Sequence, residues 1–229
     1  MSNLNHTDWI HERHVLSVLP HPDDEAFGFA GTLIRYIEHN VPVTHVCATL
    51  GEMGRNMGNP PFANRETLPL IRRKELYQSM LRMGVSRLYL LGRHDKMLEF
   101  EDPDEVAEQV KEILEEIQPS IVYTFYPGLG VHQDHDALAW AVVRAVKKLK
   151  EELRPRIFCR AVVEEAEAKL GPPHRIHDVS DLLSQKLAVI RAHQSQVHQM
   201  FPQFEEQVND PNSALSLWFS REIFWEYPC

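Results

Sequence analysis

Two short segments contain the residue types and spacings that could do chemistry. The first, "PHPDDE", places His21, Asp23 and Asp24 directly after an apolar run. Three consecutive acids would repel one another if nothing neutralised them, and a bound cation would remove that conflict. Pro20 and Pro22 bias the backbone of His21 toward extended geometry, so a stiff turn can aim these side chains.

The second segment, "VHQDHD", supplies His132, Asp134 and His135 at the expected start of a helix. The two histidines are three positions apart and can face the same side of that helix. His21, Asp24 and His135 would then form a metal triad with open coordination positions, as in a catalytic rather than a structural site. Zn²⁺ is the first expectation, but two histidines and one carboxylate can equally hold Fe²⁺.

The residues next to the expected ligands complete a hydrolytic site. A metal ion in such a site lowers the pKa of bound water to roughly 7 and polarises a carbonyl oxygen. Asp23 could take the water proton as general base. His132 could stabilise an oxyanion or protonate a leaving amine, and Asp134 could orient His132 and keep it protonated. The set predicts hydrolysis of an amide.

The apolar pattern predicts elements that bring the two segments together. Strands are expected at 14–20, 43–50, 87–92, 120–127 and 156–163, and helices at 26–39, 68–83, 104–118 and 134–152. This alternation predicts an α/β fold, with a doubly wound, mostly parallel sheet and helices on both faces. Ligands bind beyond the carboxyl ends of the strands in such a sheet, which is where both segments fall.

The rest of the chain is less regular. One long helix is expected over 179–200, followed by an aromatic-rich strand or extended segment over 214–227. Residues 51–67 and 92–103 are long irregular stretches, which in a compact domain are usually functional or mobile. We expect a single domain over 1–229, with residues 1–12 as a loosely ordered lead-in.

Composition excludes several classes of protein. With 229 residues and 43% hydrophobic content, the chain can bury one sizeable core. A formal net charge of -9 argues against nucleic-acid and anionic-membrane partners, which require a basic face. The sequence contains neither a signal-peptide pattern nor a run near the roughly 18 apolar residues of a membrane span, so we expect a cytoplasmic protein. Three widely separated cysteines suggest neither a disulfide framework nor a cysteine metal site.

Simpler explanations exist for each segment taken alone. Acids are favoured at helix N-termini by the helix dipole, without any function. The expected meeting of both segments in one crevice favours a functional site instead. Serine hydrolases and nucleotide enzymes are poor alternatives, because the sequence lacks G-x-S-x-G, a P-loop and a complete G-x-G-x-x-G.

"PHPDDE" with "VHQDHD" resembles the zinc-dependent N-acetylglucosaminyl deacetylases of the LmbE-like superfamily, which have a Rossmann-like fold. Further segments, including "GEMGRNMGNP", "LEFED" and "EIFW", resemble the second type of bacillithiol biosynthesis deacetylase, which acts on N-acetylglucosaminyl malate. The resemblance extends from about residue 13 to 227. It implies the same residue roles as the chemistry above: metal ligands His21, Asp24 and His135, general base Asp23, acid or oxyanion-stabilising His132, and its partner Asp134.

The resemblance also implies an arginine after the second strand that binds a carboxylate of the substrate. Arg55 is the best match, since guanidinium pairs with carboxylate in bidentate fashion, although it could be an exposed loop cation. Glu52 could bond a sugar hydroxyl. His193 matches a recurring family segment, without a chemical role that we can derive. Gln133 replaces the usual family proline, which would leave the turn that aims His132 less stiff.

The expected substrate is therefore a small anionic sugar conjugate, and the aromatic C-terminal segment could support a homo-oligomer. Two other enzymes remain open: an amidase acting on bacillithiol S-conjugates, and a deacetylase of another N-acetylglucosamine conjugate. A metal-binding protein without catalysis is the alternative from another class.

Overall fold

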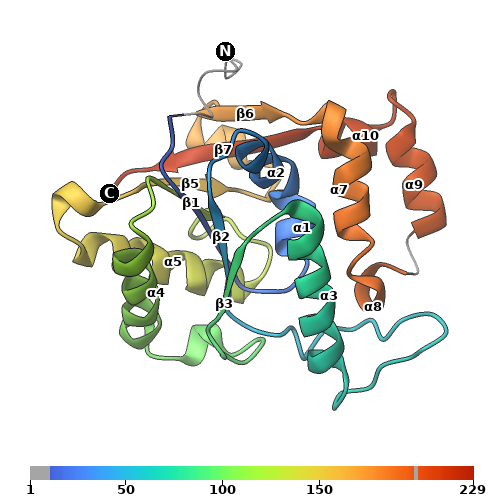
Figure 1. Cartoon of the computed structure of the whole chain (residues 1–229), viewed down its shortest axis with the longest axis horizontal. Helices are drawn as coiled ribbons and strands as arrows, with labels where there is room; N and C mark the ends of the chain where they lie inside the picture. The colour runs from blue at the N-terminus through green and yellow to red at the C-terminus, as the bar shows by residue number, and fades with distance from the viewer. Residues whose placement is uncertain (1–10, 199–200) are drawn as a thin grey trace.

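The computed structural model describes residues 11–198 and 201–229. It contains a seven-stranded sheet in the order β3-β2-β1-β4-β5-β7-β6 (Figure 1). The strands are β1 Val15–Leu19, β2 Val43–Cys47, β3 Arg87–Leu90, β4 Ile121–Phe125, β5 Arg156–Arg160, β6 Arg175–Asp178 and β7 Arg221–Tyr227. Strands β1 to β5 are parallel, and β7 runs antiparallel to both β5 and β6. The predicted mostly parallel α/β sheet is confirmed.

Helices cover the sheet on both sides. They are α1 Asp24–Gly28, α2 Ala30–Glu38, α3 Leu68–Met83, α4 Pro103–Ile117, α5 Gln133–Lys148, α6 Ala166–Leu170, α7 Leu183–Ile190, α8 Gln194–Val197, α9 Phe201–Asn209 and α10 Ala214–Phe219. Short 3-10 helices lie at Leu98–Phe100, Glu151–Leu153 and Ser180–Leu182. Figure 1 shows α4 and α5 on one side of the central strands and α1, α2, α3 and α7 on the other.

Alternate residues along each strand build two separate cores. Leu19 of β1 packs in a cluster with Leu33 of α2 and Leu76 of α3. Val18, the preceding residue, packs in the opposite cluster with Leu114 of α4. This two-residue alternation is what a sheet covered on both faces requires. Because β1 to β5 are parallel, their carboxyl ends lie along one edge.

The helix expected over 26–39 is two helices. The backbone of Phe29 leaves helical geometry, with φ of -140°, so α1 ends and α2 begins there. The carboxylate of buried Glu222 accepts hydrogen bonds from the backbone N–H groups of Gly31 and Thr32 at 3.0 and 2.7 Å. A side chain from β7 therefore satisfies the new helix start, which is a long-range effect that helical periodicity does not reveal.

The C-terminal prediction was partly wrong. Residues 179–198 form a 3-10 helix, α7 and α8 rather than one helix, and residues 199–200 of the expected helix lie outside the described part. The segment 214–227 begins as α10, whose start is capped by Ser213, and only then becomes β7. The expected lead-in over 1–12 also falls almost entirely outside the described residues.

The irregular stretch after β2 is confirmed, since residues 51–67 contain neither helix nor strand. The stretch 92–103 contains one 3-10 helix and the first residue of α4. Among the described residues, no helix is long and apolar enough to cross a membrane.

Candidate active site

The three residues expected to bind a metal lie together at the carboxyl edge of the sheet. His21 comes from the turn after β1, Asp24 begins α1, and His135 lies in the first turn of α5. Nδ1 of His21 is 3.4 Å from one carboxylate oxygen of Asp24, and Nε2 of His135 is 3.3 Å from the other. One ligand atom from each residue lies within 4.8 Å of the other two.

These distances fit a divalent cation. Around a tetrahedral ion with bonds near 2.0–2.1 Å, neighbouring ligand atoms are about 3.3 Å apart. Burial alone would raise the pKa of Asp24, but His135 and His21 hold it well below its usual range. Asp24 is therefore an ionised carboxylate, as metal binding requires. The described residues can hold a metal ion here.

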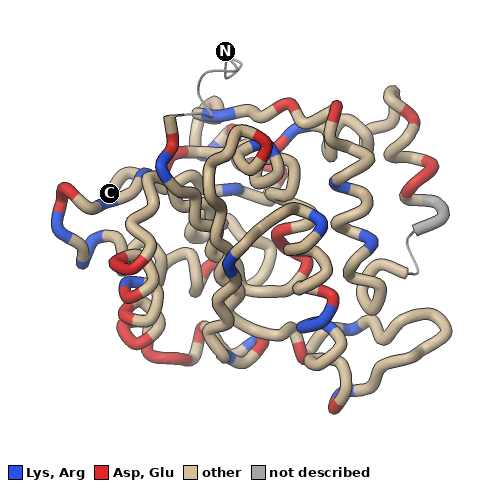
Figure 2. Tube along the Cα trace, in the orientation of Figure 1, with Lys and Arg blue, Asp and Glu red and all other residues tan. Residues whose placement is uncertain are grey.

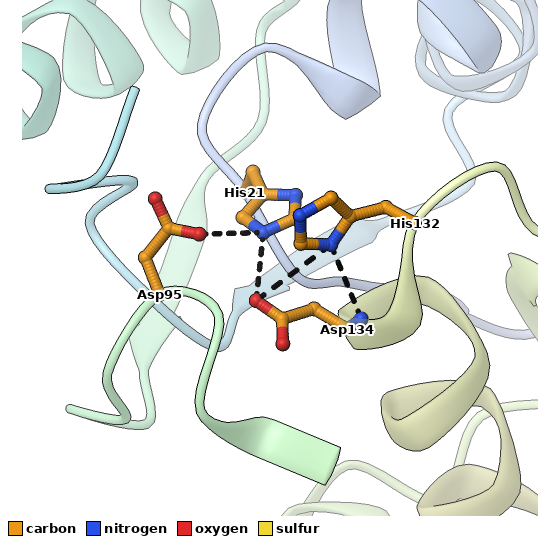
Figure 3. A group of neighbouring side chains, drawn as sticks. All are labelled: His21, Asp95, His132 and Asp134. Atoms are coloured by element: carbon orange, nitrogen blue, oxygen red, sulfur yellow. Dashed lines mark hydrogen bonds and ion pairs between the residues drawn. The ribbon is translucent and has the colours of Figure 1, made fainter. Parts of the chain in front are cut away.

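The other ring nitrogen of His21 faces carboxylates. Its Nε2 lies 3.0 Å from Oδ2 of Asp134 and 3.2 Å from Oδ1 of Asp95 (Figure 3). Burial opposes protonation of His21, but bonds to Asp134, Asp24 and Asp95 raise its pKa well above the ordinary value. A ligating histidine commonly donates its second N–H to a carboxylate, which fixes the ring orientation. Asp134 and Asp95 can both do this for His21.

Sequence reasoning missed Asp95. It lies in the irregular stretch after β3, is 5% exposed, and accepts a 2.9 Å hydrogen bond from the backbone N–H of Met53. The signal available in the sequence was an acid beyond the carboxyl end of a third parallel strand, which is the edge where ligands bind. With His21, His132 and Asp134, it makes a second cluster whose ligand atoms lie within 4.8 Å.

His132 caps α5 and borders this cluster. Its Nδ1 accepts a 3.1 Å hydrogen bond from the backbone N–H of Asp134, and its side chain is 34% exposed. Oδ2 of Asp134 lies 3.9 Å from that ring and accepts shorter bonds from His21 and from the backbone N–H of Lys96. Burial lowers the pKa of His132. In this geometry Asp134 contacts the ring of His21 directly. Its predicted role of orienting His132 and keeping it protonated stays a prediction.

Asp23, the expected general base, is bonded to an arginine. Its backbone has a φ of 113°, and one carboxylate oxygen accepts a 3.0 Å hydrogen bond from Nη2 of Arg72. Burial raises the pKa of Asp23, while the Arg72 guanidinium opposes the rise. A carboxylate with a raised pKa is suited to accept a proton.

Arg72 is a buried residue of α3 that joins two loops of the site. Besides Asp23, it donates to the backbone carbonyls of Pro22 and Gly51. Gly51 has a φ of 61°, and a Cβ there would lie 1.9 Å from the guanidinium. Glycine at this position is therefore required for the loop to approach Arg72 so closely.

Glu25, the third acid of the first segment, is fully buried. It accepts hydrogen bonds from Nε2 of His193 at 2.7 Å, from Ser79, and from the backbone N–H of Asp23 at 2.9 Å. Burial alone would raise the pKa of Glu25, but His193 lowers it to about 2. The acid is thus an ionised anchor for the backbone of the expected base. His193 acquires a contact that sequence reasoning could not supply.

The two expected substrate residues lie on the loop after β2. Arg55 is exposed. Glu52 lies against the loop after β3, because its Oε1 accepts bonds from the backbone N–H of Asp95 at 3.0 Å and from Nδ1 of His94 at 3.1 Å. Its Oε2 is buried and has no hydrogen-bond partner within the described part of the chain.

Comparisons with known proteins show the family of the chain. The model of the family described as "PIG-L: GlcNAc-PI de-N-acetylase" matches residues 16–146, which include both segments. Proteins named "Probable N-acetyl-alpha-D-glucosaminyl L-malate deacetylase 2" from Bacillus subtilis (strain 168) and Bacillus cereus are 45% and 47% identical to the chain. Each match covers 94% of the chain and 98% of the relative.

A solved structure agrees at the level of the fold. The N,N'-diacetylchitobiose deacetylase from Pyrococcus horikoshii superposes with a TM-score of 0.75 at 24% sequence identity, covering 98% of this chain and 88% of that one. The resemblance drawn from "PHPDDE" and "VHQDHD" is confirmed, and the chain belongs to the PIG-L family of LmbE-like proteins.

Proposed function

We propose that the protein is a metal-dependent hydrolase that removes the acetyl group from N-acetylglucosaminyl malate, yielding acetate and glucosaminyl malate in bacillithiol biosynthesis. Relatives that bear this substrate in their names align over 94% of the chain. The observation that carries the proposal is the convergence of His21, Asp24 and His135 beside Asp23, a carboxylate that is not a ligand.

His21, Asp24 and His135 would bind the metal ion. Two ring nitrogens and one carboxylate suit Zn²⁺ best, with Fe²⁺ as the second choice. A divalent ion held there would polarise the acetyl carbonyl and make a neighbouring water more acidic. Asp95 and Asp134 would keep the ring of His21 oriented for this task.

The chemical steps fall to the protein side chains. Asp23, held by Arg72, takes a proton from the attacking water while the water oxygen forms a bond to the acetyl carbon. His132, partly exposed beside His21, stabilises the oxyanion or gives a proton to the nitrogen as the C–N bond breaks. The products are acetate and a free amine.

Substrate choice is assigned to the loop after β2. Arg55, exposed on that loop, binds a carboxylate of the malate portion, and Glu52 on the same loop binds a sugar hydroxyl. A cytoplasmic location and self-association remain expectations of the sequence.

Acetate release tests the proposal. Zinc-loaded protein is assayed with N-acetylglucosaminyl malate, with plain N-acetylglucosamine, and after chelator treatment. Release from the malate conjugate that greatly exceeds release from N-acetylglucosamine, and that the chelator abolishes, is the expected result. Equal release from both substrates would support deacetylase activity but contradict carboxylate binding by Arg55. No release from either would contradict the proposal and direct attention to bacillithiol S-conjugates.

A further inference from the structure

The loop after β2 is held by α8, a helix 140 residues further along the chain. The side-chain amide of Asn56 donates to the backbone carbonyl of Gln196 at 2.7 Å. In return, the side-chain amide of Gln196 donates to the backbone carbonyl of Asn56 at 3.1 Å. The backbone N–H of Gly58 donates to the carbonyl of Ser195 at 3.1 Å. We call the reciprocal pair the Asn56–Gln196 contact.

Helix α8 is itself fixed firmly. Both the backbone N–H and the hydroxyl of Ser195 donate to the carboxylate of Glu75 on α3, at 2.7 and 2.6 Å. The residue before α8, His193, bonds to Glu25 behind the expected base. All four of these residues are buried. Since α8 is anchored to the frame of the site, it can act as a rigid support for the loop.

The loop after β2 packs closely against α8 and α3 at Gly54. A Cβ at Gly54 would lie 2.9 Å from Oε1 of Gln196 and 3.0 Å from Nη1 of Arg72. Exposed Arg65, further along the same loop, donates to the carbonyls of Glu52 and Gly54 at 3.2 and 2.7 Å. The loop backbone is therefore confined between α8, α3 and Arg65.

Arg55 lies within the short span between two anchored residues. Glu52 is bonded to the loop after β3, and Asn56 is bonded to Gln196, so only residues 53–55 separate the two fixed points. Weakening the second anchor loosens the backbone directly after Arg55, while Gly54 keeps its bond to Arg65. It leaves the contacts of His21, Asp24 and His135 in place, because none of them involves Gln196.

We infer that Gln196 is a specificity-determining positioning residue: through the Asn56–Gln196 contact it holds Arg55 where the acidic part of the substrate must bind. The inference rests on the proposed function. A loop held in advance spares the entropy cost of ordering it when the substrate binds, so the contact contributes to affinity for the malate portion. Plain N-acetylglucosamine, which has no malate portion, gains nothing from it.

Kinetics with two substrates test this inference. The value of kcat/KM is measured for N-acetylglucosaminyl malate and for N-acetylglucosamine, with Gln196→Ala and the wild-type protein. We expect the ratio of the two values to fall about tenfold in the variant, mainly through a higher KM for the malate conjugate. Gln194→Ala is the matched control, because Gln194 is an exposed residue two positions away on the same helix.

A merely structural role gives a different result. If Gln196→Ala lowers both kcat/KM values in proportion, or leaves their ratio at the wild-type value, the inference is wrong. Asn56→Ala removes the other hydrogen bond of the contact, the one from the Asn56 side chain to the carbonyl of Gln196, and must lower the same ratio. This second variant covers the case of a Gln196 variant that fails to fold. Each substitution removes a different one of the two hydrogen bonds, so the double variant must lower the ratio further than either single variant.

The wild-type protein separates this inference from the proposed function. If the wild-type protein releases acetate equally from both substrates, it does not recognise the malate portion, and both that part of the proposed function and this inference are wrong. Wild-type protein that prefers the malate conjugate, together with variants that keep the preference, would overturn the inference alone.

Discussion

Asp23, Asp24 and Glu25 are consecutive acids, yet each has its own partner. Asp24 faces the two histidines of the metal site, Asp23 is bonded to Arg72, and Glu25 is bonded to His193. The repulsion that the sequence displays is thus relieved in three places rather than by one cation. Only the cation could be expected from local sequence.

The acidity of Asp23 depends on Arg72. The guanidinium favours the ionised carboxylate, so replacing it in Arg72→Met raises the pKa of Asp23 further. Because a general base must be deprotonated, we expect the acidic limb of the kcat/KM profile against pH to move to higher pH. The variant then loses more activity in mildly acidic than in mildly alkaline buffer. A profile that is lowered uniformly, without displacement, would assign Arg72 a structural role alone.

The candidate site could be predicted only where its chemistry is local in sequence. The three candidate ligands could be named from the sequence because "PHPDDE" and "VHQDHD" concentrate them, and the structure brings them together. Asp95, Arg72 and His193 were not assigned their contacts, because their partners lie on other elements. Such pairings depend on how helices and loops pack at the sheet edge, which residue spacing does not specify.

Among the helices and strands, too, features encoded locally were predicted and those that depend on distant residues were not. The parallel strands and α3 to α5 were predicted, because each contains enough apolar residues in one period to reveal itself. The break at Phe29 and the interruption between α7 and α8 were not. At both points buried polar contacts replace helical ones: Glu222 bonds the start of α2, and His193 bonds Glu25 before α8 begins.

A buried pair between neighbouring strands gives a prediction about stability. Ser17 of β1 is in register with His45 of β2, and its hydroxyl lies 2.8 Å from Nδ1 of that ring. Burial lowers the pKa of His45 to about 4. The unfolded chain therefore binds the proton more tightly, and unfolding becomes easier as pH falls from about 6.5 toward 4.

We expect His45 to cost the fold about 2 kcal/mol of stability between about pH 7 and about pH 5. The free energy of unfolding is measured with denaturant at both pH values. Its decrease from the higher to the lower pH should be smaller for His45→Gln than for the wild-type protein, and the difference should equal this amount. Exposed His198→Gln is the control and should follow the wild type. Parallel pH dependence of all three proteins would contradict the assignment.

At the scale of the whole molecule, a negatively charged chain must bind an anionic substrate. Carboxylates are concentrated along α4 in Figure 2, and the formal net charge is -9. Recognition of a malate portion must therefore come from a local cation, which the proposal assigns to Arg55. The field of the whole molecule does not attract such a ligand.

Metal binding should also stabilise the whole fold, because His21 and Asp24 follow β1 whereas His135 lies in the first turn of α5. A ligand that binds only the native state adds about 2.7 kcal/mol at a concentration of 100 Kd. For a chain of this size, Tm should rise by roughly 5–10 °C when zinc is added to chelator-treated protein. Asp24→Asn should show little of this rise. An equal rise in the variant would mean that the metal binds elsewhere.

The central claim is that a metal bound by His21, Asp24 and His135 works with Asp23, which is not a ligand. The most direct measurement is acetate release from N-acetylglucosaminyl malate by Asp23→Asn protein whose metal content is determined on the same sample. We expect the variant to retain the metal content of the wild type and to lose about 100-fold or more of its kcat. Wild-type kcat in the metal-loaded variant, or loss of the metal together with activity, would contradict the account.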